Sequence, residues 1–409
     1  MRTSFARSVL KATGLTRMGR LMDATRLIQR ALSGAVLPTA KPETERRATT
    51  VAPRAPHVVV VPPAAKVLPT DTPPAAPAPL PAANDDDSSS QPQQLQPAPA
   101  AAPAPAPHPN FSEQSFAFKG QNYPYRLFVP KLADASEHAA TRTRMPLVVL
   151  LHGCKQDALD FSKGTAMNAL AAKEQCLVLY PEQITSGNQM MCWNWFEPGH
   201  QQADTGEPGM IAALTRQVLA TDFNGRRANS HRVYIAGLSA GGAMAAVVAS
   251  QHPELFAALG VHSGLPAGAA SNVITAFQAM RVGGQGQEVS AIPTIVFHGE
   301  GDTTVHPNNG ETITLDALAA LAKTGKQING PLIKTQSTAY PEGDKADRND
   351  KPTELTRYAN EAGKSFIEYW SINNGPHAWS GGSKQGSYTD PDGPSASKAM
   401  LTFFLQHRK

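Results

Sequence analysis

Residues 231–250, with the sequence HRVYIAGLSAGGAMAAVVAS, constrain the fold of this chain more than any other segment. The first half is an apolar run typical of a buried strand, and the second half is a run of small residues typical of a buried helix. Between them lies GLSAG at 237–241, where glycines on both sides of Ser239 let neighbouring backbone approach closely. The pattern predicts a tight strand-to-helix turn that projects the hydroxyl of Ser239 outward as a nucleophile.

Other apolar runs of strand length alternate with helical stretches over residues 111–409. After a predicted hairpin, we expect strands at 146–151, 176–180, 231–236, 257–262, 292–298 and 365–372. Helices are expected at several places between them, including 164–173, 210–223, 241–251 and 395–406. This alternation predicts an α/β domain with a mainly parallel central sheet and helices on both faces. Catalytic side chains should then lie at the carboxyl ends of the strands.

The strand expected at 146–151 ends in His152-Gly153-Cys154, a position from which backbone N–H groups can point at an acyl oxygen. We expect the N–H of Cys154 to be one donor of an oxyanion hole. The N–H of Ala240, immediately after the nucleophile, is the expected second donor. The alternative is that 152–154 is an ordinary turn at a strand end.

Two later strand ends carry the acid and the base that an activated serine requires. One leads into HGEGD and ends at Asp302, and the other leads into NNGPH and ends at His377, which gives the chain order Ser, Asp, His. Glu300 is the competing acid, and Asp302 is favoured because it reaches further into the loop. His298 and His306 flank the same turn and are expected to be structural or rim residues.

The residues before position 111 differ in composition from the rest of the chain. Residues 1–50 hold ten Lys or Arg against three Asp or Glu, and residues 51–110 contain 17 of the 35 prolines. Residues 111–409 carry 25 basic and 26 acidic side chains, so the formal net charge of +4 comes from the N-terminal part. A nearly neutral catalytic region gives no electrostatic support for binding nucleic acid or another polyanion.

These differences predict three parts: a basic amphipathic helical segment at 1–34, a Pro/Ala-rich disordered linker at 35–110 and a catalytic domain at 111–409. The first segment is expected to dock on a polymer granule or a membrane surface. The alternatives are a solvated helix or a helix docked on the catalytic domain. No conventional signal peptide and no apolar run of membrane-spanning length is visible in the sequence.

Several motifs, taken together and in order, resemble the polyhydroxybutyrate depolymerase family of esterases, which is close to the feruloyl and acetylxylan esterases. They are LHGCKQ at 151–156, YPEQ at 180–183, CWNWF at 192–196, GEP at 206–208, the GLSAG turn, HGEGD at 298–302 and GPHAW at 375–379. The resemblance implies an α/β-hydrolase fold, with Ser239, Asp302 and His377 in the catalytic positions and no metal or organic cofactor.

The same resemblance implies a serine esterase that acts through an acyl-enzyme on poly- or oligo-3-hydroxyalkanoate. A feruloyl or acetylxylan type of carbohydrate esterase is the alternative within the superfamily. From another class, the protein could be a granule- or membrane-docking scaffold, against which the complete triad argues. The resemblance suggests an extracellular protein, whereas the missing signal peptide suggests a cytoplasmic or granule-associated one.

Three tryptophans are candidates for substrate binding. Trp193 and Trp195 belong to the CWNWF cluster, and Trp379 follows the expected catalytic histidine by two residues. Their rings can line a groove for an acyl chain or an aromatic ester, or they can fill the core with their indole N–H groups satisfied internally. The resemblance also places Cys154 and Cys192 close together, which predicts a disulfide that fixes the oxyanion loop.

Overall fold

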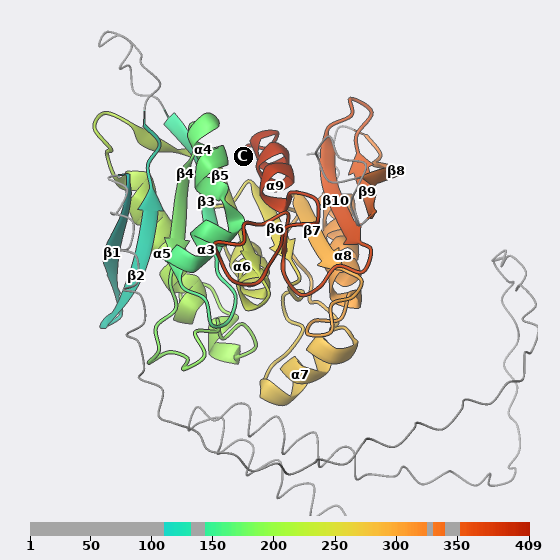
Figure 1. Cartoon of the computed structure of the whole chain (residues 1–409), viewed down its shortest axis with the longest axis horizontal. Helices are drawn as coiled ribbons and strands as arrows, with labels where there is room; N and C mark the ends of the chain where they lie inside the picture. The colour runs from blue at the N-terminus through green and yellow to red at the C-terminus, as the bar shows by residue number, and fades with distance from the viewer. Residues whose placement is uncertain (1–109, 132–143, 325–329, 340–351) are drawn as a thin grey trace, which may run out of the picture. The chain divides into compact units, whose positions relative to one another are not determined.

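The computed structural model describes residues 110–131, 144–324, 330–339 and 352–409. The predicted helical segment at 1–34 and all but the last residue of the predicted linker at 35–110 lie outside the described residues. The described part is built around a single large sheet with helices on both faces (Figure 1). This is the α/β-hydrolase architecture that the sequence predicts.

The central sheet has ten strands within the described residues, in the spatial order β1-β2-β4-β3-β5-β6-β7-β10-β9-β8. The strands are β1 (Phe111–Phe118), β2 (Gln121–Phe128), β3 (Arg144–Leu151), β4 (Leu177–Pro181), β5 (Arg227–Leu238), β6 (Ala258–His262), β7 (Thr294–Gly299), β8 (Ile333–Ala339), β9 (Thr353–Ala359) and β10 (Ser365–Ile372). The six central strands run parallel, and an antiparallel pair flanks them at each end. A parallel core places the carboxyl ends of β3, β5, β7 and β10 along one edge of the sheet.

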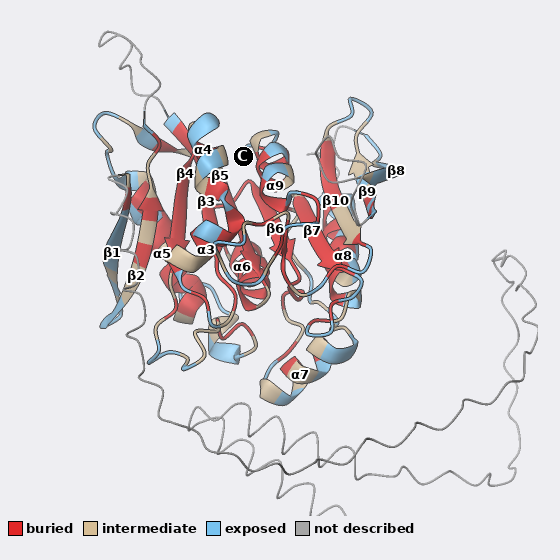
Figure 2. Cartoon of the chain, in the orientation of Figure 1, coloured by how far each residue is buried: buried red, intermediate tan, exposed pale blue. Residues whose placement is uncertain are grey.

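The sheet is covered on both faces because alternate residues of its central strands point in opposite directions. Leu147 and Val149 of β3 pack into one core cluster with α5 (Gly206–Ala220) and α6 (Ala240–Gln251). Val148 and Leu150 pack into the other cluster. The helices that supply this second cluster are α3 (Ala158–Thr165), α4 (Met167–Lys173) and α9 (Ala396–Leu405). All four of these β3 residues are fully buried, as are most of the central strand residues in Figure 2.

One helix and two strands differ from the sequence predictions. The helix predicted at 164–173 is divided, because Ala166 adopts a left-handed conformation with φ of 51° and separates α3 from α4. Strands β8 and β9 were not predicted. Strand β8 has the polar sequence IKTQSTA and lies exposed at the sheet edge, so it lacks the hydrophobic alternation that marks a half-buried strand.

Four further elements complete the site-bearing region: the helices α7 (Val273–Val282) and α8 (Asn308–Thr324), and a short parallel pair of strands, β11 (Trp379–Ser380) and β12 (Thr389–Asp390). A 3-10 turn at Pro198–His200 precedes α5. Each helix in the described part of the chain is too short or too polar to cross a lipid bilayer.

Candidate active site

Ser239 occupies a strained turn between β5 and α6. Its backbone has φ of 56° and ψ of −121°, a conformation that non-glycine residues seldom adopt and that is common at functional sites. The turn is possible because its neighbours are glycines. A Cβ at Gly237 would lie 2.4 Å from the backbone of Gly241, and a Cβ at Gly241 would lie 2.2 Å from the carbonyl oxygen of Leu151. The sequence therefore folds here into the predicted tight strand-to-helix turn, called the elbow below.

Asp302 and His377 meet at the same edge of the sheet. Asp302 follows β7, His377 follows β10, and these strands are parallel neighbours. Nδ1 of His377 donates to Oδ2 of Asp302 at 2.7 Å, while Oδ1 accepts the backbone N–H groups of Thr304 and Val305 at 2.9 and 2.8 Å. Burial by itself would raise the pKa of Asp302, but hydrogen bonds from His298 and His377 hold that pKa well below its usual value. The carboxylate is therefore ionised at neutral pH.

The competing residues of this turn have other partners. The carboxylate of Glu300 accepts a hydrogen bond from the hydroxyl of Ser371 at 2.9 Å and lies at the exposed side of the loop. His298 is buried, with Nε2 on the carbonyl oxygen of Val305 at 2.8 Å and 3.5 Å from Oδ2 of Asp302. Nδ1 of His306 accepts the N–H of Asn308. The structure thus places Asp302, rather than Glu300, against His377.

The loop His152–Cys154 leaves β3 directly beside the elbow, since β3 and β5 are parallel neighbours. Ala240 is the first residue of α6, and the first N–H groups of a helix have no partner within the helix. The N–H of Gly153 donates to Oε1 of Gln156 at 3.0 Å, and Nε2 of Gln156 donates in turn to the carboxylate of Asp160. These bonds hold the loop from the α3 side.

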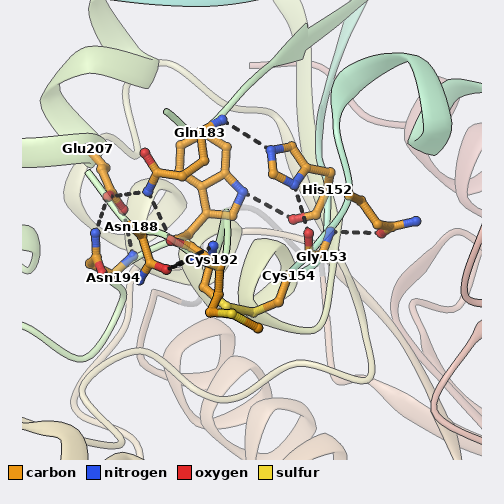
Figure 3. Close-up of a disulfide and its surroundings, with 11 residues drawn as sticks. His152, Gly153, Cys154, Gln183, Asn188, Cys192, Asn194 and Glu207 are labelled. Atoms are coloured by element: carbon orange, nitrogen blue, oxygen red, sulfur yellow. Dashed lines mark hydrogen bonds between the residues drawn. A yellow bond between two sulfur atoms is a disulfide. The ribbon is translucent and has the colours of Figure 1, made fainter. Parts of the chain in front are cut away.

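A disulfide joins Cys154 to Cys192, with 4.2 Å between the two Cα atoms (Figure 3). The predicted pairing is therefore present. Cys176, the third cysteine, is a buried free thiol whose pKa is raised to about 12 by burial. The bridge ties the proposed oxyanion residue to the segment that carries the CWNWF cluster.

A pocket of about 460 Å³ opens beside the elbow. Cys154, Ser239 and Ala240 lie in its wall. One side is formed by the segment 185–197 and the other by α7, whose contributing side chains are apolar and recur at helical spacing. These are Val273, Ala276, Phe277 and Met280. A mostly apolar pocket with a few polar groups is the usual form of a small-molecule binding site.

Comparison with known proteins shows similarity to a family of esterases. Residues 127–324 match the family model described as Esterase PHB depolymerase. The chain is 33% identical over 184 residues to poly(3-hydroxyalkanoate) depolymerase C of Paucimonas lemoignei, an alignment that covers 41% of this chain and 43% of that protein. It is 28% identical over 190 residues to a probable acetylxylan esterase A of Aspergillus fumigatus, covering 41% of this chain and 49% of that protein.

The chain also resembles a solved structure, an acetyl xylan esterase from Aspergillus awamori. The TM-score is 0.51 at 19% identity, and the match covers 72% of this chain and 99% of that one, which shows a shared fold. In both sequence alignments the chain spans less than half the length of the curated relative.

The three tryptophans predicted to bind substrate have different surroundings. Trp193 and Trp195 lie in the pocket wall, but both are almost fully buried, and the indole N–H of Trp193 donates to the carbonyl oxygen of His152 at 3.1 Å. Trp379 lies in the core instead. Its side chain is 1% exposed, stacks on His262 and donates to the hydroxyl of Ser397 at 3.0 Å. The structure therefore places Trp379 outside the pocket lining.

Two features of the candidate site were not predicted from the sequence. The apolar face of α7 was missed, although its i, i+3, i+4, i+7 spacing is a visible signal. Glu207, which is 3% exposed behind the CWNWF cluster, was noted only as part of a GEP motif. No group of three or more His, Cys, Asp or Glu side chains suited to a metal ion occurs in the described parts of the domain.

Proposed function

We propose that this protein is a serine carboxylic ester hydrolase that works through an acyl-enzyme on Ser239. The proposal rests on one observation: a strained Ser239 opens into an apolar pocket at the sheet edge that also carries the His377–Asp302 pair. A strained nucleophile, an oriented base and an ionised acid are the parts that acyl transfer requires. No metal or organic cofactor is part of this chemistry.

In the proposed mechanism His377 activates Ser239. Because Nδ1 of His377 donates to Asp302, its Nε2 carries the lone pair that accepts the serine proton. The Ser239 oxygen attacks the ester carbonyl carbon, and the ionised Asp302 stabilises the imidazolium that forms. The imidazolium then returns the proton to the departing alcohol oxygen. Water, deprotonated by the same imidazole, attacks the acyl-enzyme and releases the acid.

The N–H groups of Cys154 and Ala240 are the proposed donors to the oxyanion of both tetrahedral intermediates. Both residues line the pocket together with Ser239. A donor that is held in place before the reaction costs no reorganisation as the charge develops, and each is typically worth about 3 kcal/mol in the transition state.

The substrate class that we favour is poly- or oligo-3-hydroxyalkanoate. It is supported by the 33% identity to poly(3-hydroxyalkanoate) depolymerase C over 184 residues. Acetyl or feruloyl esters of plant polysaccharide are the alternative, supported by the similarity to acetylxylan esterase A. The basic segment 1–34 is proposed, from its sequence alone, to bring the enzyme to a polymer granule or membrane surface.

A substrate panel tests the proposal on the full chain. It compares 3-hydroxybutyrate oligomers, short p-nitrophenyl esters, acetylated xylan and methyl ferulate, for the wild type and Ser239→Ala. We expect ester hydrolysis that falls on the order of 10⁶-fold in the variant, with the oligomers having the highest kcat/KM. An inactive wild type that still binds granules would favour the scaffold alternative. A preference for acetylated xylan or ferulate would move the protein to the carbohydrate esterases.

A further inference from the structure

The segment 183–194 is attached to the oxyanion loop 152–154 and the residue after it at four points. The N–H of Gln183 donates to Nε2 of His152 at 3.1 Å, and the N–H of Lys155 donates to the carbonyl oxygen of Met190 at 2.8 Å. The indole of Trp193 and the Cys154–Cys192 disulfide supply the other two attachments. The position of this segment therefore determines the position of the loop.

Glu207 holds the segment from behind. Its Oε1 accepts Nε2 of Gln183 at 2.5 Å and Nδ2 of Asn194 at 2.6 Å, and its Oε2 accepts the backbone N–H of Asn194 at 2.7 Å (Figure 3). Nε2 of Gln183 donates also to the carbonyl oxygen of Cys192 at 2.9 Å. Glu207 lies in the first turn of α5, where the helix dipole favours a negative charge. One buried carboxylate thus accepts hydrogen bonds from both ends of the segment.

His152 connects the segment 183–194 to the peptide between Gly153 and Cys154. Because Nε2 of His152 accepts the N–H of Gln183, the proton of the neutral ring is on Nδ1. Nδ1 lies 2.8 Å from the carbonyl oxygen of Gly153 and therefore donates to it. Burial, the largest influence, lowers the pKa of His152 to about 4, so the ring is neutral at neutral pH.

The carbonyl oxygen of Gly153 also accepts the N–H of Gln156 at 3.3 Å, but the bond from His152 is the shorter of the two at 2.8 Å. Together these bonds determine where the next N–H points. The peptide between Gly153 and Cys154 is trans, as are all peptide bonds in the described chain, so its N–H is directed opposite to its C=O. With the carbonyl turned toward the His152 ring, the N–H of Cys154 is turned away from that ring. A rotation of this single peptide plane would remove the donor from the oxyanion hole.

We propose that Glu207 and His152 are positioning residues for the oxyanion hole. Glu207 holds the segment 183–194, and His152 uses that segment to fix the orientation of the Gly153–Cys154 peptide. This inference rests on the proposed esterase function. According to this inference, the buried carboxylate of Glu207 affects how well the oxyanion hole stabilises the transition state, although it lies behind the pocket rather than in it.

The first test is Glu207→Gln. The carboxylate accepts three N–H groups, one from Gln183 and two from Asn194, and Nδ1 of His200 lies 3.4 Å from its Oε2. An amide has a single accepting oxygen, so Gln must turn its own NH₂ toward at least one of these donors. We expect kcat for p-nitrophenyl butyrate to fall about tenfold to a hundredfold, as small displacements near reacting groups do, while KM stays within about twofold. Affinity for n-butylboronic acid, which forms a tetrahedral adduct with a reactive serine, should fall by a similar factor.

Glu368→Gln is the matched control. Glu368 is also a buried glutamate with two N–H partners, Nε of Arg357 at 3.1 Å and Nε1 of Trp370 at 3.1 Å, and it lies on β10 outside the pocket lining. We expect this control to lower thermal stability with kcat and boronate affinity unchanged. If Glu207→Gln behaves in the same way, with stability lowered and both readouts at the wild-type level, the positioning role is refuted.

A second variant and one measurement on the wild type test the role of His152. In His152→Phe the ring volume is kept and both ring nitrogens are lost, so kcat should fall and the effect of adding Glu207→Gln should be smaller than in the wild type. If the two substitutions lower kcat by fully additive free energies, Glu207 and His152 do not act through the same contacts. In the wild type, ¹⁵N chemical shifts should report a neutral His152 protonated at Nδ1, and protonation at Nε2 would overturn the proposal. A wild type that hydrolyses no ester would refute the proposed function instead.

Discussion

Nδ1 of His377 and Oδ2 of Asp302 lie 2.7 Å apart, although 75 residues separate them in the chain. The contact exists because β7 and β10 are adjacent parallel strands that end at the same edge of the sheet. Asp302 is also held by two backbone N–H groups, so it meets the imidazole in a defined orientation. The base of the proposed triad is therefore oriented before any substrate binds.

This relationship predicts the effect of neutralising the acid. Asp302→Asn should lower kcat about 10⁴-fold, because an amide cannot hold the productive tautomer of His377 or stabilise its charged form. Glu300→Gln is the matched control and should stay near wild-type activity, since Glu300 bonds to Ser371. Steady-state kinetics with p-nitrophenyl butyrate checks both variants. Loss of activity in Glu300→Gln alone would assign the role to Glu300.

The Cys154–Cys192 bridge predicts a specific loss of stability. The two residues are 38 positions apart, so removing the bridge with a Cys154→Ser/Cys192→Ser double variant should cost about 4 kcal/mol of unfolding free energy. Urea denaturation measures this. Intact mass should show one alkylated thiol in the unfolded, unreduced protein and three after reduction. Three alkylated thiols without reductant would exclude the bridge.

The apolar face of α7 predicts acyl-chain selectivity. Ala276 lines the pocket and is 5% exposed, so Ala276→Phe should fill space that a long acyl group needs. We expect kcat/KM to fall at least tenfold for p-nitrophenyl octanoate and much less for the acetate. Ile274→Phe, on the solvent side of the same helix at 45% exposure, is the control and should leave both values unchanged. Equal losses on the two esters would place the acyl chain elsewhere.

Buried histidines predict destabilisation by acid. His407 is 2% exposed, and burial, with a contribution from the charge of Lys364, lowers its pKa to about 3. The unfolded chain titrates near 6.5, so between these values it binds more protons than the folded chain. The stability that neutral His407 supports is thus complete above pH 6.5 and is lost as pH falls toward 3.

His407→Phe should remove this contribution. The fall in unfolding free energy between pH 7.5 and pH 5 should be about 2 kcal/mol smaller in the variant than in the wild type. Ester hydrolysis at neutral pH should be unchanged, since His407 lies outside the pocket lining. Urea denaturation at the two pH values measures the difference, and parallel pH profiles for the two proteins would contradict the assignment.

By itself, the sequence determined the nucleophile turn, the parallel core and the strand ends that carry the polar residues. These features are local: buried strands have continuous apolar runs, and GLSAG places glycines where added Cβ atoms would meet backbone at 2.2 to 2.4 Å. The order of Ser239, Asp302 and His377 along the chain could likewise be read without a structure.

The tertiary structure alone decided which groups meet. Asp302 rather than Glu300 contacts His377, because the turn after β7 directs only one carboxylate toward the neighbouring strand end. Trp379, two residues from His377, turns into the core, since β11 aims its ring at His262. Glu207 accepts a hydrogen bond from Gln183, 24 positions away, because α5 packs behind the pocket. Such contacts depend on the relative placement of whole elements, which no local pattern encodes.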